Sequence, residues 1–381
     1  MNMVLNDVCE VYSGYALKSF NEVKEGFPVI KIGNILTDGR LSLEDCQYTT
    51  ETVNTKYYSQ KDDVYVALSG ATTGKIGLME TDESYVINQR VGVVRRKDKK
   101  IPSRFIKYFL LKQTERILQE AAGCAQPNIS PKQIGAYTFP SFSSEKMEEI
   151  TRELDKVTNV IQYRYKQNNL LDCLIKARFV EMFGDVNAND RKWPIKPLGE
   201  LCNIVRGASP RPIEKFLGGT VPWIKIGDAT ENESVYLNST KEHIIENGVK
   251  KSRLVKSGSL IFANCGVSLG FARIITFDGC IHDGWLAMED VDQKLDKVFL
   301  LHTLNQVTEH FRKVAPAGTQ PNLNTAIMKS YKQILPPLEL QRTFIEFAKQ
   351  VDKSKVVVPS KIKNAIFAIM LSVSFGQITS I

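Results

Sequence analysis

The stretch that decides the fold, Phe27-Pro-Val-Ile-Lys-Ile-Gly-Asn34, returns 194 positions later as Val221-Pro-Trp-Ile-Lys-Ile-Gly-Asp228. Three further segments repeat in the same order at offsets of 193 to 196: Asp7-Val-Cys-Glu-Val-Tyr-Ser-Gly14 with Glu200-Leu-Cys-Asn-Ile-Val-Arg-Gly207, Ser69-Gly-Ala-Thr-Thr-Gly74 with Cys265-Gly-Val-Ser-Leu-Gly270, and Gln126-Pro127-Asn128 with Gln320-Pro321-Asn322. Four anchors in one order, at nearly constant spacing, indicate a tandem duplication with a period of about half the chain.

Each half predicts the same succession of elements. Short runs such as Pro28–Ile32 and Val64–Leu68, punctuated by glycine, are typical of strands. A helix is expected after Pro102, which would occupy the favoured N1 position. Apolar residues at three- and four-residue steps from Val298 to Phe311 predict its counterpart in the second half. The Gln-Pro-Asn tripeptide and a second helix follow in both halves.

The second helix of the first half should run from about Ser143 to Phe183, capped by Ser143 or Ser144. Its length is roughly 60 Å at 1.5 Å per residue. Three polar residues, Arg164, Asn168 and Arg178, interrupt a narrow apolar stripe of eight residues: Met147, Ile150, Leu154, Val157, Ile161, Leu171, Ile175 and Met182. Such a stripe favours an exposed, coiled-coil-like helix with one partner helix over a helix that lies on a globular core.

The matching helix of the second half should begin at Pro336-Pro337-Leu338-Glu339. Its expected apolar face is Leu340, Phe344, Phe347 and Val351. It should stop at Val356-Val-Val-Pro359, because proline removes a helix hydrogen bond and clashes with the preceding turn.

Composition bounds the partners of the chain. The 381 residues carry a net charge of +8, which mildly favours an anionic partner. Residues 1–140 carry a net +2 and residues 186–335 a net +4, so neither half is strongly basic and each alone is expected to bind a polyanion only weakly. Seven cysteines without a Cys-x-x-Cys pair argue against a zinc site or a disulfide framework.

The longest apolar stretch, eleven residues from Ala365 to Phe375, is too short to span a bilayer. The first ten residues lack a basic start followed by an apolar run, so a cytoplasmic location is expected.

The order of globular repeat and long helix, twice over, with the signatures IKIG, SGxxxG, QPN and PPLELQ, resembles the DNA specificity subunits of Type I restriction-modification systems. The resemblance covers about residues 5 to 358. It implies an α+β fold: a tandem duplication of two globular α/β target recognition domains separated by long antiparallel coiled-coil-like helices. The expected segments are recognition domain 1 (1–140), spacer helix 1 (141–185), recognition domain 2 (186–335), a shortened spacer helix 2 (336–358) and an atypical apolar tail (359–381).

The resemblance also implies a function. Each domain would bind one half of a split double-stranded DNA target, and the helices would dock two modification (methyltransferase) subunits, which restriction (endonuclease/translocase) subunits can join. The chain itself would be non-catalytic and bind no cofactor. S-adenosylmethionine, ATP and magnesium would be held by the partner subunits.

The chain departs from the family pattern at its end. Pro359 and the apolar tail Ile366–Phe375 replace the amphipathic rod with which the last helix of the family continues. This departure keeps open an alternative: an interaction scaffold that does not bind specific sequences, or a defective specificity subunit.

DNA contacts are expected from loop residues beside the repeated glycines, because phosphates require basic or hydroxyl groups and bases require forked or bidentate ones. The candidates in the first half are Lys31, Asn34, Thr72, Thr73, Lys75, Asn88, Gln89 and Arg90. Those in the second half are Arg206, Arg211, Lys225, Asp228, Ser268, His282 and Asp283. The Gln-Pro-Asn tripeptides are expected to form structural turns, although Gln and Asn can also bind adenine edges.

Other chemistries fit the sequence less well. The loop Gly70-Ala-Thr-Thr-Gly74-Lys75 has three residues between its glycines where a P-loop has four, and Ile76 follows the lysine. Methyltransferase motifs do not occur. His282-Asp283 as a metal pair is disfavoured, because the first half has Asn88-Gln89 at the matching place. A nuclease site built from scattered carboxylates stays open.

Overall fold

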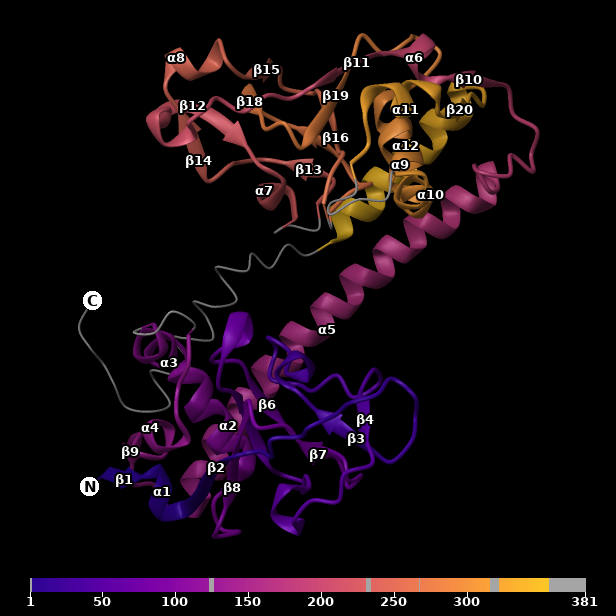
Figure 1. Cartoon of the computed structure of the whole chain (residues 1–381). Helices are drawn as coiled ribbons and strands as arrows, with labels where there is room; N and C mark the ends of the chain where they lie inside the picture. Colours follow the sequence, from indigo (N-terminus) through magenta and orange to yellow (C-terminus); the bar gives the residue numbers. More distant parts are fainter. Residues whose placement is uncertain (1, 123–126, 231–233, 267, 316–321, 356–381) are drawn as a thin grey trace. The chain divides into compact units, whose positions relative to one another are not determined.

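The computed structural model describes residues 2–122, 127–230, 234–266, 268–315 and 322–355 (Figure 1). The chain forms two compact units, the first ending at Tyr163 and the second beginning at Arg164. This division falls inside one continuous helix, α5 (Ser144–Phe183). The domain bounds given above assign that helix to a separate spacer segment, and they stay a prediction.

The first unit contains two larger sheets and a two-stranded antiparallel pair (Figure 1). The larger sheet has the order β2-β8-β5-β6, formed by Cys9–Ser13, Val91–Arg96, Val64–Ala67 and Ile76–Leu78. The smaller has the order β4-β3-β7, formed by Gln47–Thr49, Phe27–Ile30 and Val86–Ile87. Strands β1 (Asn2–Val4) and β9 (Thr138–Pro140) pair with each other. The helices are α1 (Leu5–Val8), α2 (Ser103–Lys112), α3 (Thr114–Ala121) and α4 (Pro131–Gly135), with short 3-10 turns at Ile32–Asn34, Thr55–Tyr57 and Gly70–Thr72.

The second unit has the same plan with additional strands. Its larger sheet has the order β11-β19-β16-β17-β13, formed by Asn203–Arg206, Trp285–Glu289, Leu260–Ala263, Ala272–Ile275 and Tyr236–Leu237. Its smaller sheet has the order β14-β12-β18-β15, formed by Glu242–Ile244, Leu217–Ile224, Gly279–Ile281 and Arg253–Val255. Strands β10 (Ile195–Pro197) and β20 (Lys332–Ile334) pair. The helices are α6 (Leu198–Leu201), α7 (Ile226–Thr230), α8 (Glu246–Val249), α9 (Lys297–Gln306), α10 (Thr308–Val314), α11 (Thr325–Ser330) and α12 (Leu338–Ser354), with a 3-10 turn at Ile213–Lys215.

The strand registers reproduce the duplication seen in the sequence. In the first unit, β3 pairs in parallel with β7 through Ile30 and Ile87. In the second, β12 pairs in parallel with β18 through Ile224 and Ile281, at the same offset of 194. The predicted strands at 28–32 and 64–68 are confirmed as β3 and β5, except that β3 ends at Ile30 and Ile32 already begins a 3-10 turn.

The repeated glycine after the first sheet strand is required by close packing. A Cβ atom on Gly14 would collide with the carbonyl oxygen of Ile87, and one on Gly207 would collide with that of His282. Only glycine lets the backbone approach so closely, so this position holds the chain against the β7 or β18 strand end in each unit.

The helix expected after Pro102 exists, with a different start and an interruption. Pro102 is the N-cap residue of α2 and lies outside the helix. The run then breaks at Gln113, between α2 and α3, and its counterpart breaks at Val307, between α9 and α10. Buried aromatic side chains, among them Phe105 and Phe299, anchor these helices in the core of each unit.

Helix α5 has the predicted bounds, and Ser143 caps it by accepting a hydrogen bond from the Lys146 N–H at 3.3 Å. The surroundings of α5 differ from the prediction. The beginning of its apolar stripe, Met147 to Leu154, is buried in the core of the first unit. The end of the helix, including Phe179 and Phe183, is buried in the core of the second unit. The expectation of a helix exposed to solvent except for one partner helix is therefore wrong for both ends of α5.

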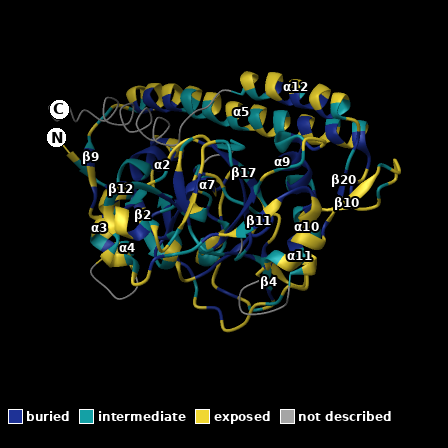
Figure 2. Cartoon of the chain, turned by 90° about the horizontal axis from the view of Figure 1, so that it is seen from above, coloured by how far each residue is buried: buried dark blue, intermediate teal, exposed yellow. Residues whose placement is uncertain are grey.

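Within the second unit, α12 packs against the last part of α5 in antiparallel orientation. The Phe344 ring lies 5.2 Å from that of Phe179, and the Lys355 amino group donates to Asp172 Oδ1 at 2.7 Å. Later residues of α12 thus meet earlier residues of α5, as an antiparallel pair requires. Buried residues follow one side of α12 and exposed residues the other (Figure 2). The helix ends at Ser354, before the predicted stop, and the segment 356–381 with its apolar tail lies outside the described residues.

Among the described helices, none combines the length and the apolar character that crossing a membrane would need.

Candidate nucleic-acid interface

The repeated Ile-Lys-Ile-Gly motif forms the same backbone corner in both units, directly after β3 and β12. The N–H of Lys31 donates to Asn34 Oδ1 at 2.8 Å, and the N–H of Lys225 donates to Asp228 Oδ2 at 2.8 Å. A side-chain oxygen three residues along thus closes the corner by accepting from the backbone, as a helix cap does.

Two of the predicted DNA-contacting residues are therefore already bonded within the protein. The Asn34 amide also donates to the Ser42 carbonyl oxygen at 2.9 Å. Asp228 is buried and accepts from the Thr240 hydroxyl at 2.8 Å. These contacts show that Asn34 and Asp228 hold the loops in place. The side chains that the corner leaves for a ligand are those of Lys31 and Lys225, three residues earlier.

The two lysines have different partners. The Lys31 amino group donates to Gln47 Oε1 at 2.7 Å and lies 4.7 Å from the centre of the Phe20 ring. The Lys225 amino group forms an ion pair with Glu242. The neutral Gln47 leaves the charge of Lys31 intact, whereas Glu242 neutralises that of Lys225.

In the first unit, the β7–β8 loop lies beside this corner. The N–H of Asn88 donates to the Ile30 carbonyl oxygen at 3.0 Å, next to Lys31. Asn88 is buried, and its side-chain oxygen accepts from the Arg90 N–H at 3.2 Å. Gln89 and Arg90 are exposed. The structure thus brings Lys31, Gln89 and Arg90 to one edge of the unit and places Asn88 beneath them.

The glycine-rich loop after β5 contacts the Gln-Pro-Asn segment. The Gly70 N–H donates to the Pro127 carbonyl oxygen at 3.2 Å, and Ser69 pairs with Asn128. Cys265 pairs with Asn322 in the same way in the second unit. The described parts of both segments thus have the structural role predicted for them, whereas Gln126, Gln320 and Pro321 lie outside the described residues.

Two of the remaining candidates in these loops, Thr72 and Thr73, are poorly placed for contact. The hydroxyl of Thr73 donates to the Gly70 carbonyl oxygen at 2.7 Å, and that of Thr72 is buried. Lys75 and Ser268 are half-buried. Gly70 and Gly74 take φ angles of 78° and 82°, which favour glycine and fix the loop shape.

In the second unit four of the candidates, Arg206, Arg211, His282 and Asp283, form one cluster. Arg206 Nε donates to the Asp283 carbonyl oxygen at 3.0 Å, and Arg211 Nη2 lies 3.4 Å from Asp283 Oδ2. The Ser209 hydroxyl donates to Asp283 Oδ1 at 2.8 Å. His282 Nε2 lies 2.9 Å from the same oxygen, and its Nδ1 accepts from the Gly284 N–H at 2.9 Å. These contacts fit a neutral imidazole with its proton on Nε2.

The electrostatics of this cluster agree with that protonation state. Burial lowers the pKa of His282, and the positive charges of Lys225, Arg211 and Arg206 lower it further against the opposing effect of Asp283. Burial raises the pKa of Asp283, but the hydrogen bond from Ser209 and the charges of His282 and Arg211 outweigh it, so the net shift is downward. At neutral pH the cluster therefore holds a carboxylate, a neutral imidazole and two guanidinium groups.

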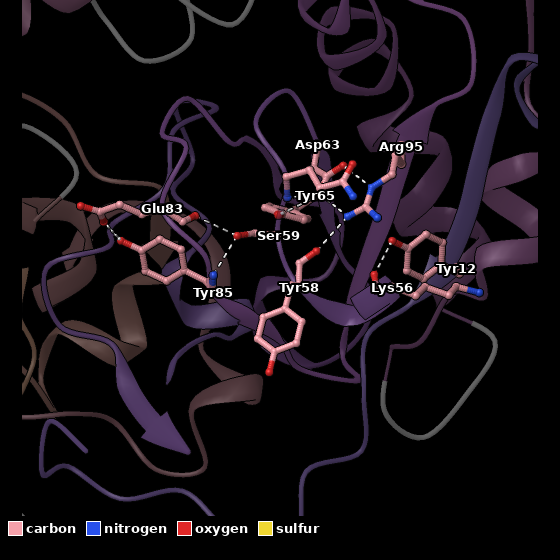
Figure 3. A network of polar contacts seen from close by, with 10 residues as sticks. Tyr12, Lys56, Tyr58, Ser59, Asp63, Tyr65, Glu83, Tyr85 and Arg95 are labelled. Atoms are coloured by element: carbon pink, nitrogen blue, oxygen red, sulfur yellow. Dashed lines mark hydrogen bonds and ion pairs between the residues drawn. The ribbon is translucent and has the colours of Figure 1, made fainter. Parts of the chain in front are cut away.

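A second polar network lies in the first unit (Figure 3). Arg95 makes two hydrogen bonds to the buried Asp63 carboxylate, at 2.8 and 2.7 Å, and a third to the Tyr58 carbonyl oxygen at 2.9 Å. The Tyr12 hydroxyl donates to the Lys56 carbonyl oxygen at 2.9 Å. The network joins β2, β5 and β8 to the turn at Thr55–Tyr57, and we assign it a structural role.

Three further residues, Gln47, Glu242 and Ser209, hold the predicted side chains and were not predicted from the sequence. Gln47 and Glu242 follow their lysines by 16 and 17 positions, so a comparison of the two halves at that spacing could have found them. Ser209 is 74 positions from Asp283, and no motif joins the two. Within the described part of the chain, no three His, Cys, Asp or Glu residues are grouped to hold a metal ion.

The fold and this interface define a class: two tandem α+β units, each presenting polar and basic side chains beside a duplicated strand–turn corner. The family model of the Type I restriction modification DNA specificity domain matches residues 1–172 and 190–367. The chain belongs to this family and carries two of its domains.

Individual relatives agree with the family assignment. The chain is 21% identical over 378 residues to a putative Type I restriction enzyme specificity subunit, MjaX, of Methanocaldococcus jannaschii, covering 91% of this chain and 85% of the relative. It is 24% identical over 323 residues to the MjaVIII specificity subunit of the same organism, covering 78% and 74%. A match to the MjaIX specificity subunit, 21% identical over 175 residues, covers 44% of this chain and 40% of that relative.

The fold is also similar to solved structures. The S subunit of a Type I restriction-modification system from M. genitalium superposes with a TM-score of 0.52 at 16% identity, covering 100% of this chain and 96% of that one. A chain from a structural study of complex assembly and conformational transition of the Type I system gives a TM-score of 0.50 at 16% identity, covering 98% and 97%. The tandem α+β fold expected from the sequence is confirmed.

Proposed function

We propose that this chain selects the DNA target of a Type I restriction-modification complex, with each unit binding one half of a bipartite duplex site. The carrying observation is the duplicated corner. The same backbone hydrogen bond, at 2.8 Å in both units, presents a lysine beside a loop whose side chains differ between the units. The same backbone corner with different side chains in each unit would allow the two units to bind two different half-sites.

The candidates divide into two groups by their contacts. Exposed or partly exposed groups on the duplicated frame are the proposed DNA contacts: Lys31, Gln89, Arg90, Arg206, Arg211 and Lys225. Asn34, Asn88, Thr72, Thr73, Asp228, His282 and Asp283 position those groups through hydrogen bonds or burial. Lys75 and Ser268 stay candidates for phosphate contacts.

The proposal extends to the partners. The family of specificity subunits supports a non-catalytic chain that binds no cofactor of its own and docks two modification subunits, to which restriction subunits can be added. S-adenosylmethionine, ATP and magnesium would then act on those partners, in the cytoplasm. Phosphate contacts from the modification subunits would compensate for the low net charge of the two units.

A methylation map tests the proposal. The complete chain is expressed with its modification subunit, and host DNA is sequenced for modified adenines. The expected result is a split motif with a fixed gap. Replacing residues 1–140 by the corresponding segment of a relative should change one half of the motif and leave the other half unchanged. A formed complex that gives no motif would contradict the proposal and favour the interaction scaffold.

A further inference from the structure

Arg206 is held in a fixed orientation at the edge of the second unit. It is the last residue of β11, where it pairs with Leu286 of β19, and the next residue, Gly207, is packed against the His282 carbonyl oxygen. Its Nε atom donates to the Asp283 carbonyl oxygen at 3.0 Å. In the described part of the chain the two terminal nitrogens have no protein partner, and the residue is exposed.

Arg211 approaches the same aspartate from the following loop. Its side chain is 81% exposed, and Nη2 lies 3.4 Å from Asp283 Oδ2. Ser209 and His282 bind the other carboxylate oxygen, at 2.8 and 2.9 Å, so the carboxylate itself is fixed. Asp283 therefore orients both arginines, one through its carbonyl oxygen and the other through its carboxylate.

The first unit does not repeat this arrangement. Ser13 is the last residue of β2, the strand equivalent to β11, and so takes the place of Arg206. Asn88 and Gln89 take the places of His282 and Asp283. At the place of Arg206 the first unit thus has a hydroxyl, and at the place of Asp283 it has the exposed amide of Gln89.

These side chains favour different bases. A guanidinium fork donates two hydrogen bonds to O6 and N7 of guanine in the major groove, whereas an amide pairs with N6 and N7 of adenine. A fork that is already oriented loses less conformational freedom on binding and discriminates more sharply. A lysine or an unsupported arginine would serve equally well for a phosphate contact, which needs no such orientation.

We propose that Arg206, with Arg211 beside it, recognises a guanine in the half-site bound by the second unit, and that Asp283 is the positioning residue for both. This inference rests on the proposed function and deepens it, because it names the base that one half-site contains. Arg206 is the specificity-determining group, since its strand and its Nε hydrogen bond fix it. Arg211 supports it from the loop.

The experiment measures binding of the complete chain, assembled with its modification subunit, to duplexes carrying the motif found by methylation mapping. Each guanine of the motif is replaced in turn by 7-deazaguanine, which lacks the N7 acceptor. One substitution, in the half-site of the second unit, should weaken binding roughly 2- to 10-fold, as expected for loss of one of the two hydrogen bonds of a bidentate contact.

Three variants separate base recognition from charge. Arg206→Ala should bind the unmodified duplex more weakly by a larger factor, roughly 5- to 100-fold, and lose nothing further on 7-deaza substitution. Arg206→Lys keeps the charge and should preserve the salt dependence while losing sensitivity to the substitution. Asp283→Asn leaves the carbonyl oxygen that holds Arg206 and removes the charge that orients Arg211, so it should weaken binding while keeping that sensitivity. Arg253→Ala, an exposed arginine on β15 of the same unit, is the matched control and should leave the sensitivity unchanged.

The outcomes distinguish this inference from the proposed function. If the assembly binds a specific split motif but no guanine depends on Arg206, or if that half-site contains no guanine, the inference is overturned and the function stands. If the assembly binds no specific motif, both fail. Additive losses from Arg206→Ala and 7-deazaguanine would likewise overturn the inference, because residues in contact must couple.

Discussion

Lys31 and Lys225 occupy matching corners, yet their partners predict different contributions to DNA binding. Lys31 donates to the neutral Gln47, whereas Lys225 is paired with Glu242. A lysine whose charge is already neutralised displaces fewer counterions when it meets a phosphate. Replacing Lys31 by methionine, which keeps an unbranched side chain and removes the charge, should therefore cost more salt-dependent affinity than replacing Lys225 by methionine.

The magnitude follows from counterion release. Each phosphate contact contributes about −0.9 to the slope of log affinity against log salt. Loss of the Lys31 contact should make the slope shallower by about 0.9, so the fall in affinity between 50 and 200 mM salt would be smaller by about 3.5-fold. Lys225→Met should change the slope by much less. Glu242→Gln should release the charge of Lys225 and make the slope steeper by up to about 0.9.

Fluorescence anisotropy of a labelled duplex, titrated with the complete chain and its modification subunit at four salt concentrations, gives these slopes. Lys256→Met serves as the control, because Lys256 forms an exposed ion pair with Asp278 away from the corner. Equal slope changes for the Lys31 and Lys225 variants, or an unchanged slope for Glu242→Gln, would refute the reasoning.

Three further predictions concern the frame beneath the interface. Arg95→Met leaves the carboxylate of Asp63, whose side chain is 2% exposed, without its bidentate partner. Urea titration should show that the free energy of unfolding of the first unit falls by about 3–5 kcal/mol. A fall below about 1 kcal/mol would contradict the structural role of this pair. Gly14→Ala should destabilise the unit by about 1–3 kcal/mol through backbone collision, whereas Gly33→Ala, with open space, should be nearly neutral; similar losses would show the packing argument to be wrong. Burial lowers the pKa of His302 from 6.5 to about 4, so the unfolded state takes up the proton first as the pH falls. The second unit should then lose up to roughly 3 kcal/mol between pH 6.5 and 4, and a His302→Leu variant with an undiminished pH slope would exclude this residue as the cause.

The sequence predicts the helices and strands of the two units well, because they depend on local and repeated patterns. The bounds of α5 follow from apolar residues at alternating three- and four-residue steps and from the Ser143 cap. The duplication follows from anchors that the structure places in equivalent strands. The packing of Met147 and Phe179 into the two cores was not predictable in this way, since the apolar stripe does not reveal what covers it.

The sequence predicts the interface less well because side-chain direction depends on partners far along the chain. Asn34 and Asp228 have the residue types that bind bases. Their side-chain oxygens, however, already accept a hydrogen bond from the backbone N–H of the lysine three residues earlier. Asp283 was a candidate for base contact, but Ser209, 74 positions away, helps to make it an anchor. In each case the residue type was informative, and a hydrogen bond to a separate segment determined its use.

The contrast between the two units suggests how the target of such a chain can change. Positions whose atoms are used inside the protein keep their type in both halves: glycine at 14 and 207, and an amide or carboxylate oxygen at 34 and 228. Positions that face outward differ, as Ser13 and Arg206 do at the end of equivalent strands. A substitution at an outward position removes no buried contact, so it can alter base preference at little cost in stability. A substitution at an inward position displaces the whole corner, and with it every side chain that the corner presents. New half-site preferences should therefore arise through Arg206 and its neighbours far more readily than through Asp228.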